Sequence, residues 1–173
     1  LVTLLAECYK KDKGEDFALE FLESKSTTNS IAVVLEQVSI YNDRKDYEKS
    51  RKLIHPIYLQ YPNNESLKYL YAKIALELSL YEIALYFLRG LTYEYPKNSI
   101  YWGYLSNCAV SLDFYDLAMV SARKANELNE EKEEWINSNI GNMLKNKGFY
   151  TEGIQYLEKG LKLNKNSDYA TIS

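Results

Sequence analysis

Ser-Ile-Tyr-Trp-Gly-Tyr-Leu-Ser-Asn-Cys-Ala, residues 99–109, is the stretch that decides the fold of this chain. A short break at Asp113 and Phe114 follows it, and a second apolar pattern then runs through Ala118 and Ala122. Apolar residues at helical spacing on both sides of a break predict two amphipathic helices joined by a tight turn. The alanines would allow the two helices to approach closely.

The small residue at position 118 recurs along the chain at a constant interval. Ala118 lies 34 residues after Ala84, which itself lies 34 residues after Ser50. Gly153 follows Ala118 by 35 residues, which indicates one inserted residue between them. This period predicts an array of helix pairs, because one such pair cannot bury its apolar face alone.

The opening stretch carries a resemblance to a known family. Trp102, Leu105 and Ser106 fall at the W-x2-L-G spacing of a tetratricopeptide repeat, and Ala118 matches the small residue of its second helix. The chain therefore resembles the tetratricopeptide repeat (TPR) family. This implies an all-α fold, an α-α superhelix (solenoid) of antiparallel helix pairs, in one TPR-like array over residues 1–173 with a right-handed twist. The expected units are 1–30 (partial), 31–64, 65–98, 99–133 and 134–167, with 168–173 as the start of a truncated or capping helix.

Two residues depart from the repeat pattern. Pro56 falls inside an expected helix, where it should remove a backbone hydrogen bond and kink the chain. Lys68 stands where the repeat normally has a large apolar residue. We expect that contact to be weakened, or to be supplied by Leu67 instead.

Composition and charge exclude several classes of protein. The 173 residues are 46% hydrophobic and 26% charged, which is a globular balance. The formal net charge is −3, and the basic residues are interleaved with Asp and Glu, so we expect no nucleic-acid surface. No apolar run is long enough for a transmembrane helix, so we expect no membrane insertion.

The cysteines and the first residue bear on the cellular location. Cys8 and Cys108 lie far apart within helical patterns, which indicates two buried thiols in a reducing compartment. We therefore expect a cytoplasmic protein. The chain begins with Leu1, so we expect a piece of a longer protein, and a targeting signal upstream of this residue stays open.

Catalytic motifs are absent from the sequence. The single histidine, His55, has no arrangement of Asp or Cys around it that would predict a catalytic or metal site. No G-x-x-x-x-G-K-[ST], H-E-x-x-H or C-x-x-C motif occurs. The acidic run 129–134 is better explained as a solvated helix start than as a cation site. We expect no enzymatic activity, no metal and no cofactor.

The resemblance places the candidate functional residues on the first helix of each pair, which lines a concave peptide-binding groove in the family. An asparagine amide both donates and accepts hydrogen bonds, so it can pair with a peptide backbone of any sequence. For Tyr69 and Tyr104 the alternative is that they fill space between helices. Trp135 is either partly exposed at the acidic run or buried in place of Asn137. The candidate peptide-binding residues are Tyr69, Lys73, Tyr104, Asn107, Asn139 and Asn142.

Three functions are compatible with these features. The first is a non-catalytic protein–protein interaction scaffold that binds a peptide or a partner helix in the groove, with possible self-association through an exposed apolar end of the array. The second is a peptide-sensing regulatory module of a larger signalling or effector protein, with flexible joints at Pro56 and Lys68. The third is an RNA-binding helical repeat, which the acidic balance disfavours.

Overall fold

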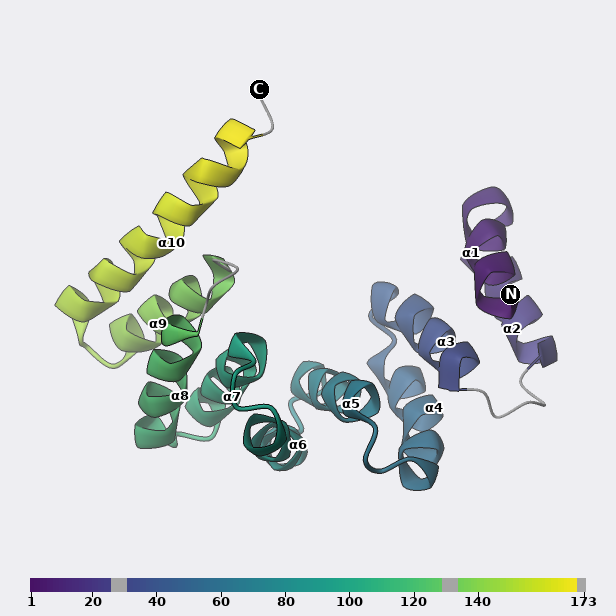
Figure 1. The fold of residues 1–173 in the computed structure, drawn as a ribbon, viewed down its shortest axis with the longest axis horizontal. Helices are drawn as coiled ribbons and strands as arrows, with labels where there is room; N and C mark the ends of the chain where they lie inside the picture. The colour runs from purple at the N-terminus through teal and green to yellow at the C-terminus, as the bar shows by residue number, and fades with distance from the viewer. Residues whose placement is uncertain (26–30, 129–133, 171–173) are drawn as a thin grey trace. The chain divides into compact units, whose positions relative to one another are not determined.

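The computed structural model describes residues 1–25, 31–128 and 134–170, with side chains as far as residue 163. Within these ranges the chain forms ten α helices and no strand (Figure 1). This confirms the expected all-α class. The helices are α1 (Val2–Lys13), α2 (Glu15–Lys25), α3 (Ile31–Asp43), α4 (Tyr47–Gln60), α5 (Glu65–Glu77), α6 (Tyr81–Glu94), α7 (Ser99–Ser111), α8 (Tyr115–Glu127), α9 (Glu134–Asn146) and α10 (Tyr150–Ala170).

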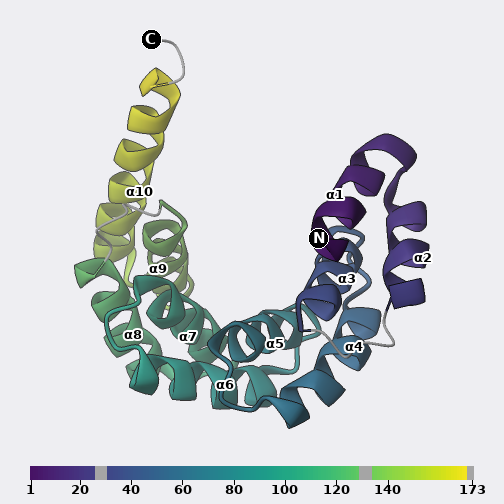
Figure 2. The same cartoon turned by 45° about the vertical axis from the view of Figure 1, so that its right-hand side comes forward.

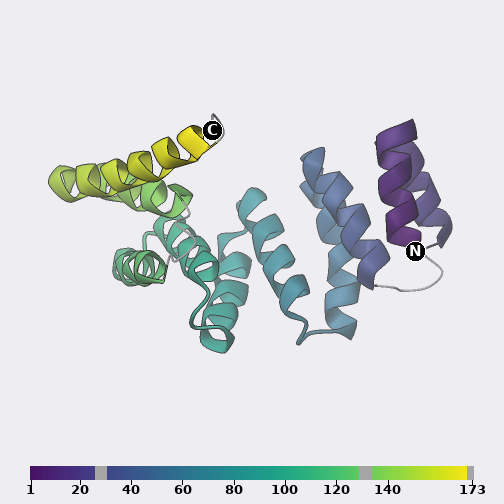
Figure 3. The ribbon, with the colours of Figure 1, turned by 45° about the horizontal axis from the view of Figure 1, so that its top comes forward.

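The chain divides into two compact units, Leu1–Leu80 and Tyr81–Ser173, and each is described by itself. In the first unit α1 packs against α2 and α3 against α4, and α5 packs against α4 (Figures 2 and 3). In the second unit α6 packs against α7, α7 against α8, and α9 against α10. The division falls inside the expected unit 65–98, so one continuous array over 1–173 stays a prediction.

The turns inside the four helix pairs from α3–α4 to α9–α10 share one conformation, which the α1–α2 turn at Gly14 does not. Lys45, Ser79, Asp113 and Gly148 all have a positive φ, between 57° and 83°. The residue after each of them donates its N–H to a carbonyl five residues back, as in the Phe114 bond to the Ala109 oxygen (2.8 Å). This is the helix ending in which one left-handed residue satisfies the last carbonyls. These four turns follow the period that the small residues predicted.

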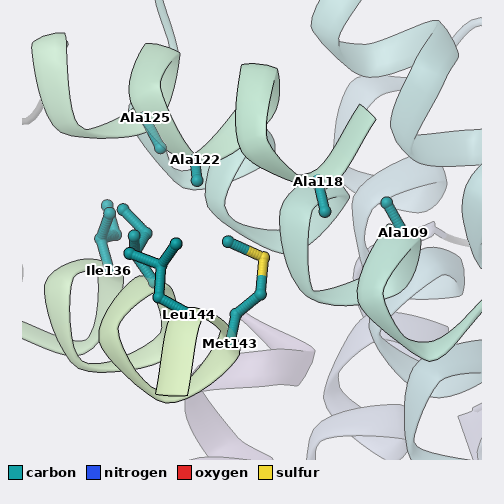
Figure 4. Packing of buried hydrophobic residues seen from close by; sticks show 8 residues of the cluster. Ala109, Ala118, Ala122, Ala125, Ile136, Met143 and Leu144 are labelled. Carbon is teal, nitrogen blue, oxygen red and sulfur yellow. The ribbon is translucent and has the colours of Figure 1, made fainter. Parts of the chain in front are cut away.

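Close approach within the pairs depends on those small residues. Ser106 Oγ donates to the Ala118 carbonyl at 3.0 Å, which ties α7 to α8. A Cβ on Gly141 would lie 2.9 Å from the Gly153 carbonyl, closer than a real contact allows. The main apolar core of the second unit lies beside these contacts, with Met143 and Leu144 of α9 directed toward the alanines of α8 (Figure 4). Its buried members are Ala109, Ala118, Ala122, Ala125, Ile136, Ile140, Met143 and Leu144.

Asparagines cap two of the helices. The side chain of Asn64 accepts the N–H of Leu67 at 3.0 Å at the start of α5. Asn98 accepts the N–H groups of Ile100 and Tyr101 at the start of α7. Such caps satisfy amides that have no partner within the helix, and each stabilises a helix by about 1 kcal/mol.

The two departures from the repeat pattern are accommodated within helices. Helix α4 runs on through Pro56 to Gln60. Leu67 is fully buried and Lys68 is only 9% exposed, so Leu67 supplies the apolar contact that Lys68 does not.

Two expectations need correction. Helix α10 continues to Ala170, so residues 168–170 extend it and do not begin a new helix. The physical reason is that neither glycine nor proline interrupts the chain between Gly160 and Ala170. Cys8 is exposed, because no described residue covers its face of α1, whereas Cys108 is buried as expected. Residues 171–173 and most of the acidic run, 129–133, lie outside the described residues.

Candidate peptide-binding surface

The first unit contributes two of the six candidate residues, both on α5. Lys73 Nζ lies 5.6 Å from the centre of the Tyr69 ring, one helical turn away, and both side chains are half-buried. A cation at this distance is attracted to the negative face of the ring. The contact leaves the ammonium group at a partly exposed position, where it can meet an anionic group of a ligand.

The second unit brings an aromatic pair together from two helices. The rings of Tyr104 on α7 and Trp135 on α9 have centroids 5.1 Å apart at an angle of 42°. Both side chains are half-buried. Tyr104 therefore fills space between α7 and α9 and also keeps part of its ring accessible.

Trp135 is half-buried at the start of α9, which agrees with the partly exposed alternative, and it does not replace Asn137 in the core. Its ring lies over Gly103, where an added Cβ would be 2.6 Å from Trp135 Cη2. Asn137 is the buried residue, 3% exposed, and its Oδ1 has no hydrogen-bond partner among the described residues. The missing side chain at Gly103 is what makes room for the indole ring on the surface of α7.

The three candidate asparagines lie on the same two helices as the aromatic pair. Asn139 and Asn142 follow Trp135 by four and seven residues on α9, which places all three on one helix face. Asn107 is one turn beyond Tyr104 on α7. Asn107 and Asn139 are half-buried and Asn142 is exposed. Four of the six candidates thus lie on α7 and α9, the two helices that carry the Tyr104–Trp135 contact.

The side-chain amides of these asparagines make no hydrogen bond to any described residue; only the main-chain carbonyl of Asn107 accepts one, from Ser111 Oγ at 3.3 Å. An unpaired amide at a partly buried position retains a donor and an acceptor for a ligand.

His55 has a packing role in the structure. Its Nδ1 lies 2.9 Å from the Tyr71 hydroxyl. The Tyr58 ring stacks on the Tyr71 ring, with 5.8 Å between the ring centroids. Tyr71 is 7% exposed, so this hydrogen bond gives a nearly buried hydroxyl a partner. This contact could not be predicted from the sequence, since the three residues come from two helices.

The described residues also bear on three further questions: a reactive thiol, a metal-binding cluster and a membrane-spanning helix. Burial, with a smaller effect of the nearby Glu82 carboxylate, raises the pKa of the Cys108 thiol to about 11, so it is protonated at neutral pH. No group of three or more His, Cys, Asp or Glu side chains within the described residues could hold a metal ion. Among the helices as described, none is long and apolar enough to cross a membrane.

Comparisons with known proteins bear on the fold. No protein-family profile matches the chain, and no curated protein matches it. Solved structures of MamA do. A MamA RS-1 double mutant is 16% identical, with 97% of this chain and 95% of the other covered, at a TM-score of 0.84. Residues 41 to the end of MamA from Desulfovibrio magneticus RS-1 are 15% identical over 96% of this chain and 95% of the other, also at 0.84. A further crystal structure of MamA is 15% identical over 92% and 95%, at 0.78.

At this level of identity the likeness concerns the fold alone. The all-helical chain has the TPR-like helical solenoid fold of these MamA structures. The repeat resemblance found in the sequence is thereby supported by structural similarity.

Proposed function

We propose that this chain is a non-catalytic protein–protein interaction scaffold that binds a peptide or a partner helix along the first helices of its pairs. The observation that carries the proposal is the set of three asparagine amides without a hydrogen-bond partner among the described residues, on the same two helices as the half-buried Tyr104–Trp135 pair. The binding residues in this proposal are Tyr69, Lys73, Tyr104, Asn107, Asn139 and Asn142.

The amides supply affinity that does not depend on the peptide's side chains. Asn107 and Asn142 occupy equivalent positions of adjacent repeats, 35 residues apart. Each can pair with one peptide group of a bound segment, donating through its nitrogen and accepting through its oxygen. The neighbouring rings of Tyr104 and Trp135 offer a flat apolar surface for a side chain of the ligand.

Lys73 adds a charge preference in the first unit. Its ammonium group is held over the Tyr69 ring, and it forms no ion pair within the part of the chain that the structure describes. A ligand with an acidic side chain opposite α5 would therefore bind more tightly than a neutral one.

Self-association is a further part of the proposal. Tyr150, Ile154 and Leu161 of α10 are 65%, 55% and 60% exposed, and helical spacing puts Tyr150, Ile154 and Leu161 on one side of the helix. Large apolar side chains exposed along a helix commonly mark a protein contact.

The test is a comparison of partner binding by the wild type and an Asn107→Ala/Asn142→Ala double variant. Partners are first captured by pull-down, and the affinity of the strongest is then measured by calorimetric titration. Loss of two amide hydrogen bonds should weaken binding by about tenfold or more. Asn146→Ala, at an exposed position of the same helix α9, is the matched control and should bind as the wild type does. An unchanged affinity in the double variant would remove both asparagines from the site.

A further inference from the structure

The first unit contains a cavity of about 550 Å³ between α2, α3 and α4. Its walls are formed by Val33, Gln37 and Tyr41 of α3, by Lys52, Leu53 and Pro56 of α4, and by further side chains of these helices and α2. The volume lies within the range of small-ligand and peptide side-chain sites. None of the six residues of the proposed peptide-binding surface contributes to it.

Gln37 gives the cavity a polar group without a partner. Its side chain is 3% exposed and lines the cavity, and no described residue forms a hydrogen bond with its amide. The donor and the acceptor of Gln37 are therefore available to whatever enters the cavity.

Pro56 adds an acceptor on the opposite wall. In an α helix the carbonyl of residue 52 accepts the N–H of residue 56, and proline has none. Lys52 and Pro56 both line the cavity, one turn apart on α4. The main-chain oxygen of Lys52 thus lacks its usual helical donor on the side of the helix where the cavity lies.

Charge distinguishes the two sides of the cavity. Lys49 and Lys52 belong to the α4 side, and Glu23 belongs to the α2 side. Lys49 Nζ is 2.8 Å from Asp46 Oδ2 and 5.3 Å from the centre of the Tyr41 ring, so part of its charge is already compensated. The α4 side stays net positive, because two ammonium groups meet one carboxylate there. An acidic ligand would place its carboxylate against α4.

We propose that this cavity is a second binding site, for an acidic peptide segment that carries a bulky apolar side chain. The apolar side chain lies against Val33 and Leu53, and an adjacent carboxylate pairs with Lys52. The Gln37 amide pairs with the peptide backbone, and a backbone N–H of the peptide donates to the Lys52 carbonyl. A small amphiphilic carboxylate would satisfy the lysine but has no N–H for that carbonyl, which is why the donor and acceptor set favours a peptide.

The experiment selects ligands from a phage-displayed library of random twelve-residue peptides on the immobilised 173-residue chain. Enriched peptides are synthesised with a fluorescein label, and their affinities are measured by fluorescence anisotropy. We expect enrichment of peptides with Asp or Glu next to Leu, Ile or Phe. Gln37→Leu keeps the side-chain size and removes the amide. Both Gln37→Leu and Lys52→Glu should weaken the binding of these peptides by about tenfold or more.

Matched variants keep the two sites distinguishable. Lys162→Glu makes the same charge change at an exposed position of α10, and it should leave the affinity within about twofold. Asn107→Ala/Asn142→Ala should also leave it unchanged. Circular dichroism measures the helix content of Gln37→Leu and so checks its fold. Lys52→Glu changes an exposed residue that folding does not need, so it tests the site independently of folding.

Three results would overturn the proposal. The first is that all enriched peptides lose affinity for the Asn107→Ala/Asn142→Ala variant. This result would agree with the proposed function and would remove the second site. Another is an affinity that neither Gln37→Leu nor Lys52→Glu changes. The third is displacement of the acidic peptides by dodecanoate with equal or higher affinity, which would assign the cavity to a small amphiphilic anion.

Discussion

The junction between successive helix pairs is built differently in the two units. In the first unit α1 and α2 meet α3 through an apolar cluster that includes Leu22, Val33 and Ile40. Ion pairs flank this cluster, among them Lys10–Asp43 at 2.7 Å and Arg44–Glu15 at 2.8 Å, and a cavity lies nearby between α2, α3 and α4. In the second unit α8 meets α9 through a closed apolar cluster that includes Ala122 and Ile136 (Figure 4). Both junctions therefore have an apolar centre, and they differ in the ion pairs and the cavity that the first unit adds beside it.

The largest expected effect tests the closed packing of the second unit. Gly141→Ala adds one methyl group where its Cβ would lie 2.6 Å from Leu157 Cγ and 2.9 Å from the Gly153 carbonyl. Because a backbone atom cannot move aside cheaply, we expect the free energy of unfolding to fall by about 1–3 kcal/mol, even though alanine is a better helix former. Chemical denaturation followed by circular dichroism measures the change.

Two control variants each add one carbon atom at a position where the structure has free space around the side chain. Gly90→Ala lies in the interior of α6 with nothing within 4 Å of the added Cβ, and it should stabilise by about 0.5–1 kcal/mol. Val34→Ile adds one carbon at the wall of the first-unit cavity and should change stability by less than about 0.5 kcal/mol. Equal losses for all three variants would contradict the assignment of Gly141 to a close contact within the α9–α10 pair.

The difference between the buried thiol of Cys108 and the exposed thiol of Cys8 can be tested through the pH dependence of stability. The pKa of Cys108 is raised from 9.0 to about 11 by burial, so the folded chain holds this proton more tightly than the unfolded chain does. The contribution of Cys108 to stability is fully present below pH 9 and is lost as the pH rises toward 11. Unfolding free energies measured across this range should fall less steeply in Cys108→Ala than in the wild type. Cys8→Ala, at an exposed position, should leave the slope unchanged, and an identical slope in all three proteins would refute the assignment.

The sequence contained the repeat in a form that could be recognised, because the small residues and turns follow backbone geometry. Ser50 and Ala118 mark the close contacts, and Lys45, Ser79 and Asp113 each end a helix in the same left-handed conformation. Backbone requirements of this kind depend on neighbours within one helix pair. They leave a periodic trace that one sequence can show.

Contacts between helix pairs left no comparable periodic pattern in the sequence. The place of Trp135 depends on the space over Gly103, which lies 32 residues earlier on another helix. The isolation of the Gln37 amide and the cavity around it depend on side chains of three helices. The candidate asparagines were placed on α7 and α9 by the repeat register alone, and their role in binding stays a prediction.

The smallest expected effect concerns the ion pairs of the first junction. Arg44 Nε lies 2.8 Å from Glu15 and its Nη1 lies 2.8 Å from Asp16, so one guanidinium group links the end of α3 to the start of α2. The side chain of Arg44 is about one third exposed (32%), and salt screens such pairs. Arg44→Gln should therefore reduce the hydrogen-exchange protection of α1 and α2 slightly at low ionic strength.

The dependence on salt separates electrostatics from packing at this junction. At 10 mM NaCl the Debye length is about 30 Å and the wild-type pairs act at nearly full strength, whereas near 1 M it is about 3 Å. The difference in protection between Arg44→Gln and the wild type should therefore shrink as salt is added, with α9 and α10 unaffected throughout. Arg123→Gln, at an exposed position of α8, is the control and should change neither region. A loss of protection that is the same at both salt concentrations would mean that Arg44 acts through the packing of its aliphatic stem, and that the two junctions differ less in chemistry than their contacts indicate.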